Sequence, residues 1–471
     1  MLRKVLIGLV VLISAAAGAG WYLLRNEERP PVLSEGARCR IGAYQLAGGE
    51  AGSSQGLAYV RQREGEVLRL VFEDGQTLRL QPGPGDGYRI AEGEGSVVFD
   101  CAAGTMAIER DGRTISGKRI ALAERPISFT SHDVSLRGKI VEPAGGVKPA
   151  AYVVLVHGSE HSSAIFGYDW QYILAAHGIG VVVYDKRGTG LSAGEYSQDF
   201  HLLSDDTVAA IAELRRQVPG NYQVGAMGAS QGGWIAPLAA TKTDLDFVIA
   251  LYGLAESPLA EDRDEVLLGL AEAGFGDEET RKKALEVTAA TGRVMASDYQ
   301  SGWEELAAVK EKYGKEPFFA HLDGEFTGDF TKNPPWALKR IGPFYDEGTS
   351  WEYEPLPTLE KIEVDHLWVL AGDDHEAPSA RTREILLSLQ ARRPKLDIAY
   401  FPRADHGMIV FDPVPPGEKA KEPRTWRYAA GYHPLVVDWI KSRRLPAEGP
   451  DLVVASGAAD LPAPAPETPA E

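Results

Sequence analysis

Short apolar runs alternate with helical stretches along most of the chain after about Pro126. The runs are rich in Val, Ile and Tyr: AYVVLVHG, GVVVYDKRG, YQVGAMGAS, DFVIALYG, HLWVLAGDD and LDIAYFPRADHG. Buried strands separated by helices are typical of a parallel sheet that is covered by helices on both faces. The segments ISFTS and VSLRGKIVEP, which precede these runs, indicate a hairpin. This pattern predicts an α/β domain over residues 126–445.

The alternation stops between Ala255 and about Tyr353, where helical periodicity gives way to a stretch with ten aromatic residues. We expect a cap insertion over about residues 256–355, above the carboxyl ends of the strands, where such sheets bind ligands. Its aromatic residues either line an acyl or aromatic pocket or pack the cap itself. The insertion holds 22 acidic and 11 basic residues. This charge either disfavours anionic substrates or only solvates the surface helices.

Residues 34–125 have a different pattern, in which short alternating runs are broken by Gly and Asp: VLRLVF, TLRLQP, GDGYRI, SVVFDC and TMAIERDGR. Runs of this length bounded by Asp-Gly turns indicate β-hairpins, so we expect a small all-β domain. The two cysteines of the chain, Cys39 and Cys101, both fall in it. In an oxidising compartment such a pair is expected to form a disulfide, and two unpaired buried thiols are the alternative.

The amino terminus carries an export pattern. Arg3 and Lys4 precede an uncharged run over residues 5–24, and Arg25 follows it. A positive flank and an apolar run are typical of a secretory signal. A helix of this length would also cross a hydrocarbon core about 30 Å thick, as a membrane anchor does. Residues 1–33 are therefore expected to be a signal peptide or a membrane anchor with a linker, and either implies a periplasmic or extracellular-facing protein.

Two further features concern the tail and the charge. Residues 446–471 are rich in Pro, Ala and Glu, which predicts a disordered tail. The net charge of the chain is −18. A protein that binds nucleic acid without sequence preference needs a basic face, so the charge argues against that class.

The motif Gly-x-Ser-x-Gly occurs twice. At 52–56 it lies in a Gly-rich loop with no buried strand before it and no helix after it, so Ser54 is interpreted as part of a hairpin connection. At 228–232 it follows an apolar strand and opens a helical run. That context is typical of a nucleophile elbow, in which Gly228 and Gly232 are needed because strand and helix leave no room for a Cβ. Ser230 is therefore the predicted nucleophile.

Other segments around this elbow resemble the α/β-hydrolase fold superfamily. HGSE at 157–160 resembles its oxyanion loop, DKRGTGLS at 185–192 resembles the turn after its next strand, and GGW at 232–234 extends the elbow as in esterase-, lysophospholipase- and acyl-aminoacyl-peptidase-like members. The resemblance covers roughly 126–444 and implies a mostly parallel sheet flanked by helices, with a cap insertion and no cofactor. By elbow geometry the N–H of Gln231 is one oxyanion donor. The resemblance assigns the second donor to Ser159.

The acid and the histidine of a triad should follow the serine in that order. The strand HLWVLA ends just before Gly372. The family pattern that the chain resembles is Gly-x-x-Asp with a Pro four residues after the Asp, and Pro378 therefore favours Asp374 as the acid. The distance from Gly372 to Asp374 is one residue shorter than in that pattern, which leaves Asp373 as a rival. Of the ten histidines, His406 alone lies in a loop after the next strand. The histidines show no metal-binding spacing, so no metal is expected.

These residues predict acyl transfer by an exported serine hydrolase. Carboxylic esters are the first expectation for its small-molecule substrate. A serine peptidase of the same mechanism, acting on short peptides, is the second, because the acidic cap could anchor an amine. A third interpretation is a non-catalytic envelope-binding protein on a hydrolase scaffold, against which the presence of all three triad residue types argues. Membrane attachment through residues 5–24 is compatible with each.

Overall fold

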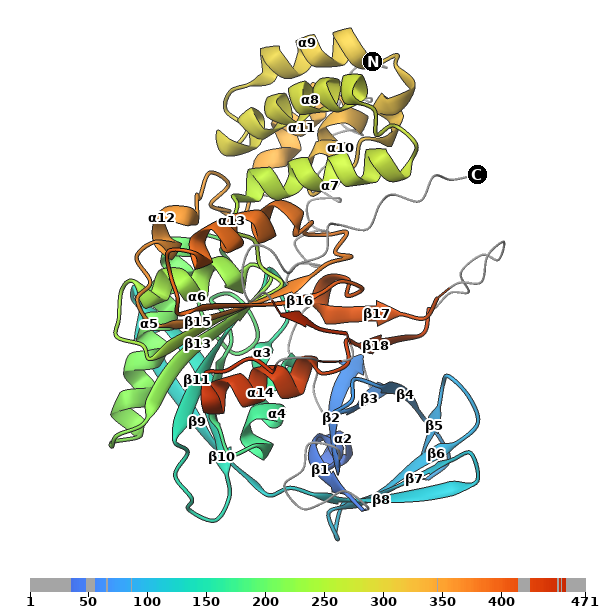
Figure 1. The fold of residues 1–471 in the computed structure, drawn as a ribbon, viewed down its shortest axis with the longest axis vertical. Helices are drawn as coiled ribbons and strands as arrows, with labels where there is room; N and C mark the ends of the chain where they lie inside the picture. Colours follow the sequence, from blue (N-terminus) through green and yellow to red (C-terminus); the bar gives the residue numbers. More distant parts are fainter. Residues whose placement is uncertain are drawn as a thin grey trace, which may run out of the picture.

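The computed structural model describes residues 35–47, 56–64, 67–85, 87–344, 346–413, 424–446, 449 and 451–454. It contains a β-barrel, a nine-stranded sheet flanked by helices, and a helical cap (Figure 1). The expected export segment over residues 5–24 lies outside the described residues. Within the described ranges, no helix is long and apolar enough to cross a membrane, and no group of His, Cys, Asp and Glu side chains could hold a metal ion.

The amino-terminal β domain is a closed barrel of eight antiparallel strands, in which β1 also pairs with β8. Its core contains buried aromatic and aliphatic side chains such as Tyr44, Tyr59 and Leu70. The expected small all-β domain is therefore confirmed. The strands are β1 (Gly42–Leu46), β2 (Leu57–Glu64), β3 (Val67–Phe72), β4 (Thr77–Pro82), β5 (Gly87–Ile90), β6 (Ser96–Asp100), β7 (Thr105–Arg110) and β8 (Arg113–Arg119).

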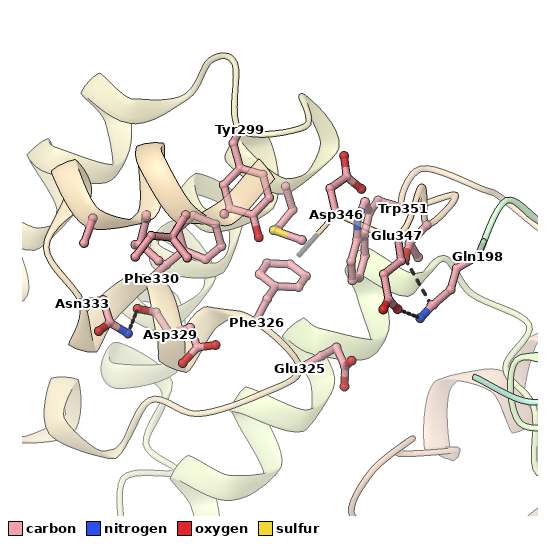
Figure 2. Close-up of a pocket in the computed structure, with 16 residues that line it drawn as sticks. Gln198, Tyr299, Glu325, Phe326, Asp329, Phe330, Asn333, Asp346, Glu347 and Trp351 are labelled. Atoms are coloured by element: carbon pink, nitrogen blue, oxygen red, sulfur yellow. Dashed lines mark hydrogen bonds between the residues drawn. The ribbon is translucent and has the colours of Figure 1, made fainter. Parts of the chain in front are cut away.

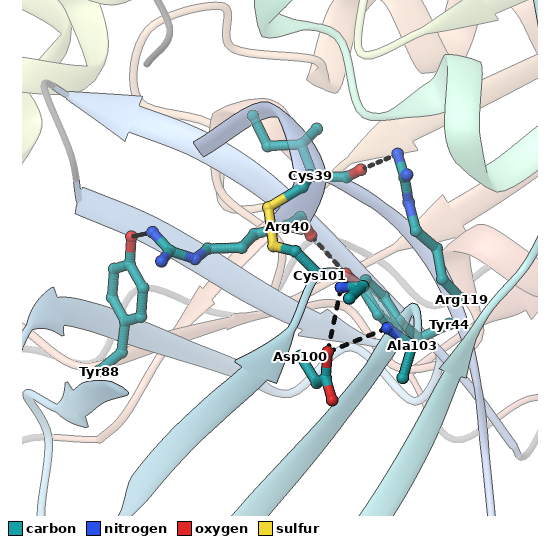
Figure 3. Close-up of a disulfide and its surroundings, with 10 residues drawn as sticks. Cys39, Arg40, Tyr44, Tyr88, Asp100, Cys101, Ala103 and Arg119 are labelled. Carbon is teal, nitrogen blue, oxygen red and sulfur yellow. Dashed lines mark hydrogen bonds between the residues drawn. A yellow bond between two sulfur atoms is a disulfide. The ribbon is translucent and has the colours of Figure 1, made fainter. Parts of the chain in front are cut away.

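A disulfide joins Cys39 to Cys101, which confirms the expected pairing (Figure 3). Cys39 lies in the short helix α2 (Glu35–Arg40), and Cys101 follows β6. The bridge spans 62 residues. In the chain-entropy model a loop of this length contributes about 4 kcal/mol by restricting the unfolded chain. The bridge therefore ties the helix before β1 to the end of β6.

The larger sheet has the strand order β19-β16-β15-β14-β13-β11-β12-β10-β9. The pairs from β12 through β11 to β16 are parallel, and the outer pairs are antiparallel. This confirms the expected α/β-hydrolase sheet. The strands are β9 (Leu122–Ser131), β10 (Val134–Pro143), β11 (Ala151–Val156), β12 (Gly180–Tyr184), β13 (Gln223–Ala229), β14 (Phe247–Leu251), β15 (Asp365–Ala371), β16 (Leu396–Phe401) and β19 (Val453–Val454).

Helices cover both faces of this sheet, as the apolar character of its strands requires. On one face α4 (Trp170–Ala176) and α14 (Tyr432–Ser442) share a hydrophobic cluster with the barrel, next to the short helix α3 (Ala164–Gly167). The helices of the other face are α5 (Phe200–Gln217), α6 (Gly232–Ala240), α12 (Leu356–Leu359) and α13 (Ala380–Gln390). The shared cluster fixes the barrel against the catalytic domain.

The cap leaves the sheet after β14 and returns at β15, so it is inserted where a parallel strand ends (Figure 1). Two small clusters of buried apolar side chains hold its helices together. Its elements are α7 (Pro258–Glu272), α8 (Glu278–Ala296), α9 (Trp303–Tyr313), α10 (Thr327–Lys332) and α11 (Pro335–Ile341), with 3₁₀ turns η2 (Pro317–His321) and η3 (Gly342–Phe344).

Two boundaries differ from the sequence-based expectation. The strand β9 of the large sheet begins at Leu122, before the expected boundary at residue 125; it is an edge strand, where charged residues and Pro126 are tolerated. The prediction that the whole segment 446–471 is disordered is wrong for Val453–Val454. These residues form β19 on the other edge of the sheet, because the backbone of β16 there offers unpaired hydrogen-bonding groups.

A second hairpin, β17 (Ile409–Phe411) and β18 (Trp426–Tyr428), follows the 3₁₀ turn η4 (His406–Met408) and meets the barrel. The N–H of Tyr428 donates to the carbonyl of Gly75 at 2.8 Å. Thr77 Oγ1 donates to the carbonyl of Trp426 at 2.8 Å. The barrel therefore contacts the segment that directly follows the predicted catalytic histidine.

Candidate active site

Ser230 occupies a sharp turn between β13 and α6. Its φ is +53°, in the left-handed region that L-residues rarely adopt. The turn is held because the N–H of Ser230 donates to the carbonyl of Leu251 at 2.9 Å and the N–H of Gly233 donates to the carbonyl of Ser230 at 2.7 Å. Strain that the surrounding structure fixes in this way is common at functional sites. Ser54, in the other copy of the motif, lies outside the described residues.

The two elbow glycines are required by close packing of strand on helix. A Cβ on Gly228 would overlap the carbonyl oxygen of Gly232. A Cβ on Gly232 would lie 2.8 Å from the carbonyl oxygens of both Val156 and His157. Real Cβ atoms do not approach backbone oxygens so closely, so both positions admit only glycine without a backbone shift.

The structure brings Asp374 and His406 together. His406 Nδ1 lies 2.9 Å from Asp374 Oδ2 and 3.2 Å from Asp374 Oδ1. Asp374 is buried, and its Oδ1 also accepts the N–H of Ala377 at 2.8 Å. Asp373, the rival acid, is exposed and uses its carbonyl to contact His375 Nδ1 at 2.9 Å. The carboxylate that orients His406 is therefore that of Asp374.

Carboxylates surround the other side of the His406 ring as well. Its Nε2 lies 3.6 Å from Glu376 Oε1. Burial disfavours the protonated ring, but the hydrogen bond and charge of Asp374, followed by the charges of Glu376 and Asp405, outweigh this and raise the pKa of His406. A base with a raised pKa is a stronger proton acceptor, and it is neutral only at higher pH.

The two predicted oxyanion donors lie on either side of the elbow. Gln231 is buried at the start of α6, where the first N–H groups of a helix have no intrahelical acceptor. Ser159 follows Gly158, and a Cβ on Gly158 would lie 3.6 Å from the Cβ of Ser230. The loop over residues 157–160 therefore passes directly beside the predicted nucleophile.

Ser230 opens into a cavity of about 470 Å³ whose wall is rich in aromatic rings. The Tyr252 ring packs edge-on against His406, with centroids 5.0 Å apart, and Gly407 also lines the cavity. The barrel contributes Arg61, whose Nη2 donates to the hydroxyl of Tyr428 at 3.0 Å. The aromatic residues of the wall are Tyr168, Trp170, Tyr252, Phe411, Trp426, Tyr428 and Tyr432.

A second cavity of about 440 Å³ lies within the cap (Figure 2). Its aromatic residues are Tyr299, Phe326, Phe330 and Trp351, and its acidic residues are Glu325, Asp329, Asp346 and Glu347. Ser230 does not line it. Cap rings such as Phe326 and Phe330 thus both line a pocket and pack the cap, but the rings around the predicted nucleophile come from elsewhere in the sequence.

Gln198 links the cap cavity to Gln231, the residue after the predicted nucleophile. Gln198 Nε2 donates to Glu347 Oε2 at 2.6 Å, as Figure 2 shows. Gln231 Nε2 donates to Gln198 Oε1 at 2.9 Å. Sequence patterns did not single out Gln198, Arg61 or the β17–β18 hairpin, because none carries a motif and all three reach the site through tertiary packing alone.

The sheet order, the elbow and the loop beside it give the larger domain the α/β-hydrolase fold. Residues 147–255 match the model of a family described as serine aminopeptidase, S33. The matched segment includes the oxyanion loop and the elbow but ends before Asp374 and His406.

Solved structures include similar folds. A Pyrococcus furiosus esterase is 16% identical, with a TM-score of 0.38, over 61% of this chain and 85% of its own. A Pyrococcus horikoshii acylaminoacyl peptidase is 15% identical, with a TM-score of 0.42, over 83% of this chain and 57% of its own. A Penicillium α/β hydrolase is 18% identical, with a TM-score of 0.36, over 60% and 91%. No curated protein matches the sequence.

Proposed function

We propose that this hydrolase cleaves carboxylic esters with Ser230 as nucleophile, His406 as general base and Asp374 as the orienting acid. The observation that carries the proposal is the Asp374–His406 hydrogen bond together with an elbow serine whose cavity, lined by seven aromatic residues, also includes Gly407, the neighbour of His406. Such a cavity suits an apolar or aromatic acyl group and requires no charged anchor.

In the first half of the reaction, His406 Nε2 takes the proton of the Ser230 hydroxyl as the oxygen attacks the ester carbonyl. Asp374 holds Nδ1 and stabilises the imidazolium that forms. The N–H groups of Gln231 and Ser159 donate hydrogen bonds to the negatively charged oxygen of the tetrahedral intermediate, and each donor of this kind contributes about 3 kcal/mol. His406 then gives its proton to the leaving alkoxide. Water attacks the acyl-enzyme with His406 again as base.

A fluorophosphonate probe tests the nucleophile. The chain without residues 1–33 should be labelled, Ser230→Ala should abolish labelling, and Ser54→Ala should not change it. Labelling that survives Ser230→Ala would refute the assignment. Absence of labelling in the wild-type chain would instead favour a non-catalytic binding protein.

An aminopeptidase is the second candidate, favoured by the carboxylates between the cap and His406. Burial, with the charge of Glu325 next, raises the pKa of Glu265 to about 8. Burial and the charge of Glu376 likewise raise the pKa of Glu325. A nearby cation, such as the ammonium group of a peptide amino terminus, would favour the ionised form of these carboxylates and so would bind there. The name of the matching family points the same way.

Paired substrates separate the two candidates. Rates on 4-nitrophenyl esters of short and long acyl chains should exceed those on aminoacyl 4-nitroanilides with a free amine. Faster cleavage of the anilides, lost on blocking the amine, would establish the peptidase and overturn the ester proposal.

We also propose that the protein is exported, by a signal peptide or membrane anchor within residues 1–33. The support is the apolar run over residues 5–24 and the Cys39–Cys101 disulfide, since disulfides persist in oxidising compartments. A reporter that is active only after export, fused behind residue 33, should be active, and a fusion lacking residues 5–24 should not. Equal reporter activity in both fusions would contradict export.

A further inference from the structure

Lys186 buries a charged side chain next to the oxyanion loop. The residue is 1% exposed. Its Nζ donates to the carbonyl of Gly158 at 2.9 Å and to the hydroxyl of Tyr196 at 3.2 Å, and it lies 4.3 Å from the centroid of the Tyr196 ring. Removing an ammonium group from water costs several kcal/mol, which nearby polar groups must offset. The Lys186 ammonium group is therefore stabilised by its contacts with Gly158 of the oxyanion loop and with Tyr196.

The contact with Gly158 fixes the direction of a peptide group. The carbonyl of Gly158 and the N–H of Ser159 belong to the same planar trans peptide, so they point in opposite directions. Because Lys186 holds the carbonyl, the N–H of Ser159 is directed away from Lys186. This N–H is the predicted second oxyanion donor, and Gly158 lies against Ser230.

The neighbouring groups of the loop are held as well. The Tyr196 hydroxyl, which contacts Lys186, donates to the carbonyl of Ser159. The N–H of Gly158 donates to the hydroxyl of Tyr168 at 3.0 Å. Side chains therefore engage both carbonyls and one N–H of this dipeptide, and its fourth backbone group, the N–H of Ser159, is the predicted oxyanion donor.

We propose that Lys186 is a positioning residue that orients and polarises the Gly158–Ser159 peptide toward the oxyanion formed during acyl transfer. A cation at the carbonyl oxygen draws electron density through the peptide and strengthens the hydrogen bond that the N–H donates. It also places a positive charge behind the site where negative charge develops. The inference rests on the proposed function of Ser230 and adds the residue that prepares its oxyanion hole.

The protonation of Lys186 gives the proposal a pH signature. Burial lowers its pKa to about 8, and the charges of Glu160 and Glu347 oppose this shift. The protonated form is the one that holds the peptide, so kcat should fall as pH rises through about 8. Charged and titratable groups from several elements surround Lys186. The oxyanion loop contributes His157, Glu160 and His161, and the turn of Lys186 itself contributes Asp185 and Arg187. The others are Tyr168 before that turn, Tyr196 after it and Glu347 of the cap.

The test measures ester hydrolysis by the wild-type chain and Lys186→Met between about pH 6 and pH 10, a range that extends to both sides of the Lys186 pKa of about 8. Ser230→Ala gives the background rate. We expect Lys186→Met to lower kcat about 10- to 100-fold at neutral pH, a fraction of the loss that follows removal of a whole oxyanion donor. KM should stay within about threefold, and the decline of kcat near pH 8 should disappear.

Two further variants keep the result interpretable. Lys242→Met makes the same substitution at a partly exposed lysine that contacts Asp205 and should leave the pH profile unchanged. Lys186→Arg keeps the charge at high pH and should move the decline to higher pH even if Lys186→Met fails to fold. A decline that persists unchanged in Lys186→Met or Lys186→Arg, or is missing from the wild type, overturns the inference while fluorophosphonate labelling of Ser230 stands. Absence of fluorophosphonate labelling in the wild-type chain overturns the proposed function and this inference together.

Discussion

Two cavities of similar size, one at Ser230 and one in the cap, differ in charge. Both have several aromatic rings in their walls. The cavity that holds Ser230 combines Glu160 and Asp169 with the guanidinium of Arg61, whereas the charged groups that line the cap cavity are four carboxylates. Four of the 22 acidic residues of the cap therefore line one cavity, whereas aromatic rings line both cavities. Of the two, only the first cavity is lined by Ser230, the proposed nucleophile.

The largest expected effect tests whether the chemistry depends on the pair that faces the first cavity. Asp374→Asn should lower kcat about 10⁴-fold, because an amide cannot hold the His406 tautomer that accepts the serine proton. Asp373→Asn changes an exposed neighbour and is the matched control, expected to alter kcat less than about threefold. Steady-state ester hydrolysis measures both. A larger loss in Asp373→Asn would reverse the assignment of the acid.

A smaller effect tests which cavity receives the acyl group. Phe411→Ala removes a ring from the Ser230 cavity and should lower kcat/KM for long-chain or aromatic esters about tenfold, through lost apolar contact. Acetate esters should change little. Trp351→Ala makes a comparable truncation in the cap cavity and should have the weaker effect. The opposite order for the two variants would place the acyl group in the cap.

The smallest effect concerns the charge of Glu376 beside His406. Burial lowers the pKa of His406, whereas the hydrogen bond and charge of Asp374 raise it. The charge of Glu376 raises this pKa further. Glu376→Gln should therefore lower this pKa and move the acid limb of kcat/KM to lower pH. Glu272→Gln, which alters an exposed carboxylate paired with His375, is the control and should leave the limb in place. An acid limb that does not move in Glu376→Gln would show that the carboxylate does not act on His406.

Much of the fold was predictable because local patterns carried it. The buried strands from β11 to β16, the cap insertion and the small β domain each followed from periodicity and turn residues, and the disulfide followed from two cysteines in one β unit. The boundary before β9 and the strand β19 were not predictable, because edge strands tolerate charged residues and Pro and carry a weak apolar signal.

The sequence by itself determined the residues that need a local backbone shape. Ser230 with its flanking glycines and the order serine, acid, histidine can be recognised along the chain, because the strained turn and the strand ends leave a motif. The tertiary structure decided between Asp373 and Asp374, since burial and a 2.9 Å contact with His406 depend on how two loops meet. It also decided that Arg61 of the barrel reaches the Ser230 cavity and that Lys186 holds the oxyanion loop. Those contacts join residues far apart in the chain, and such proximity leaves no periodicity or spacing in the sequence to indicate it.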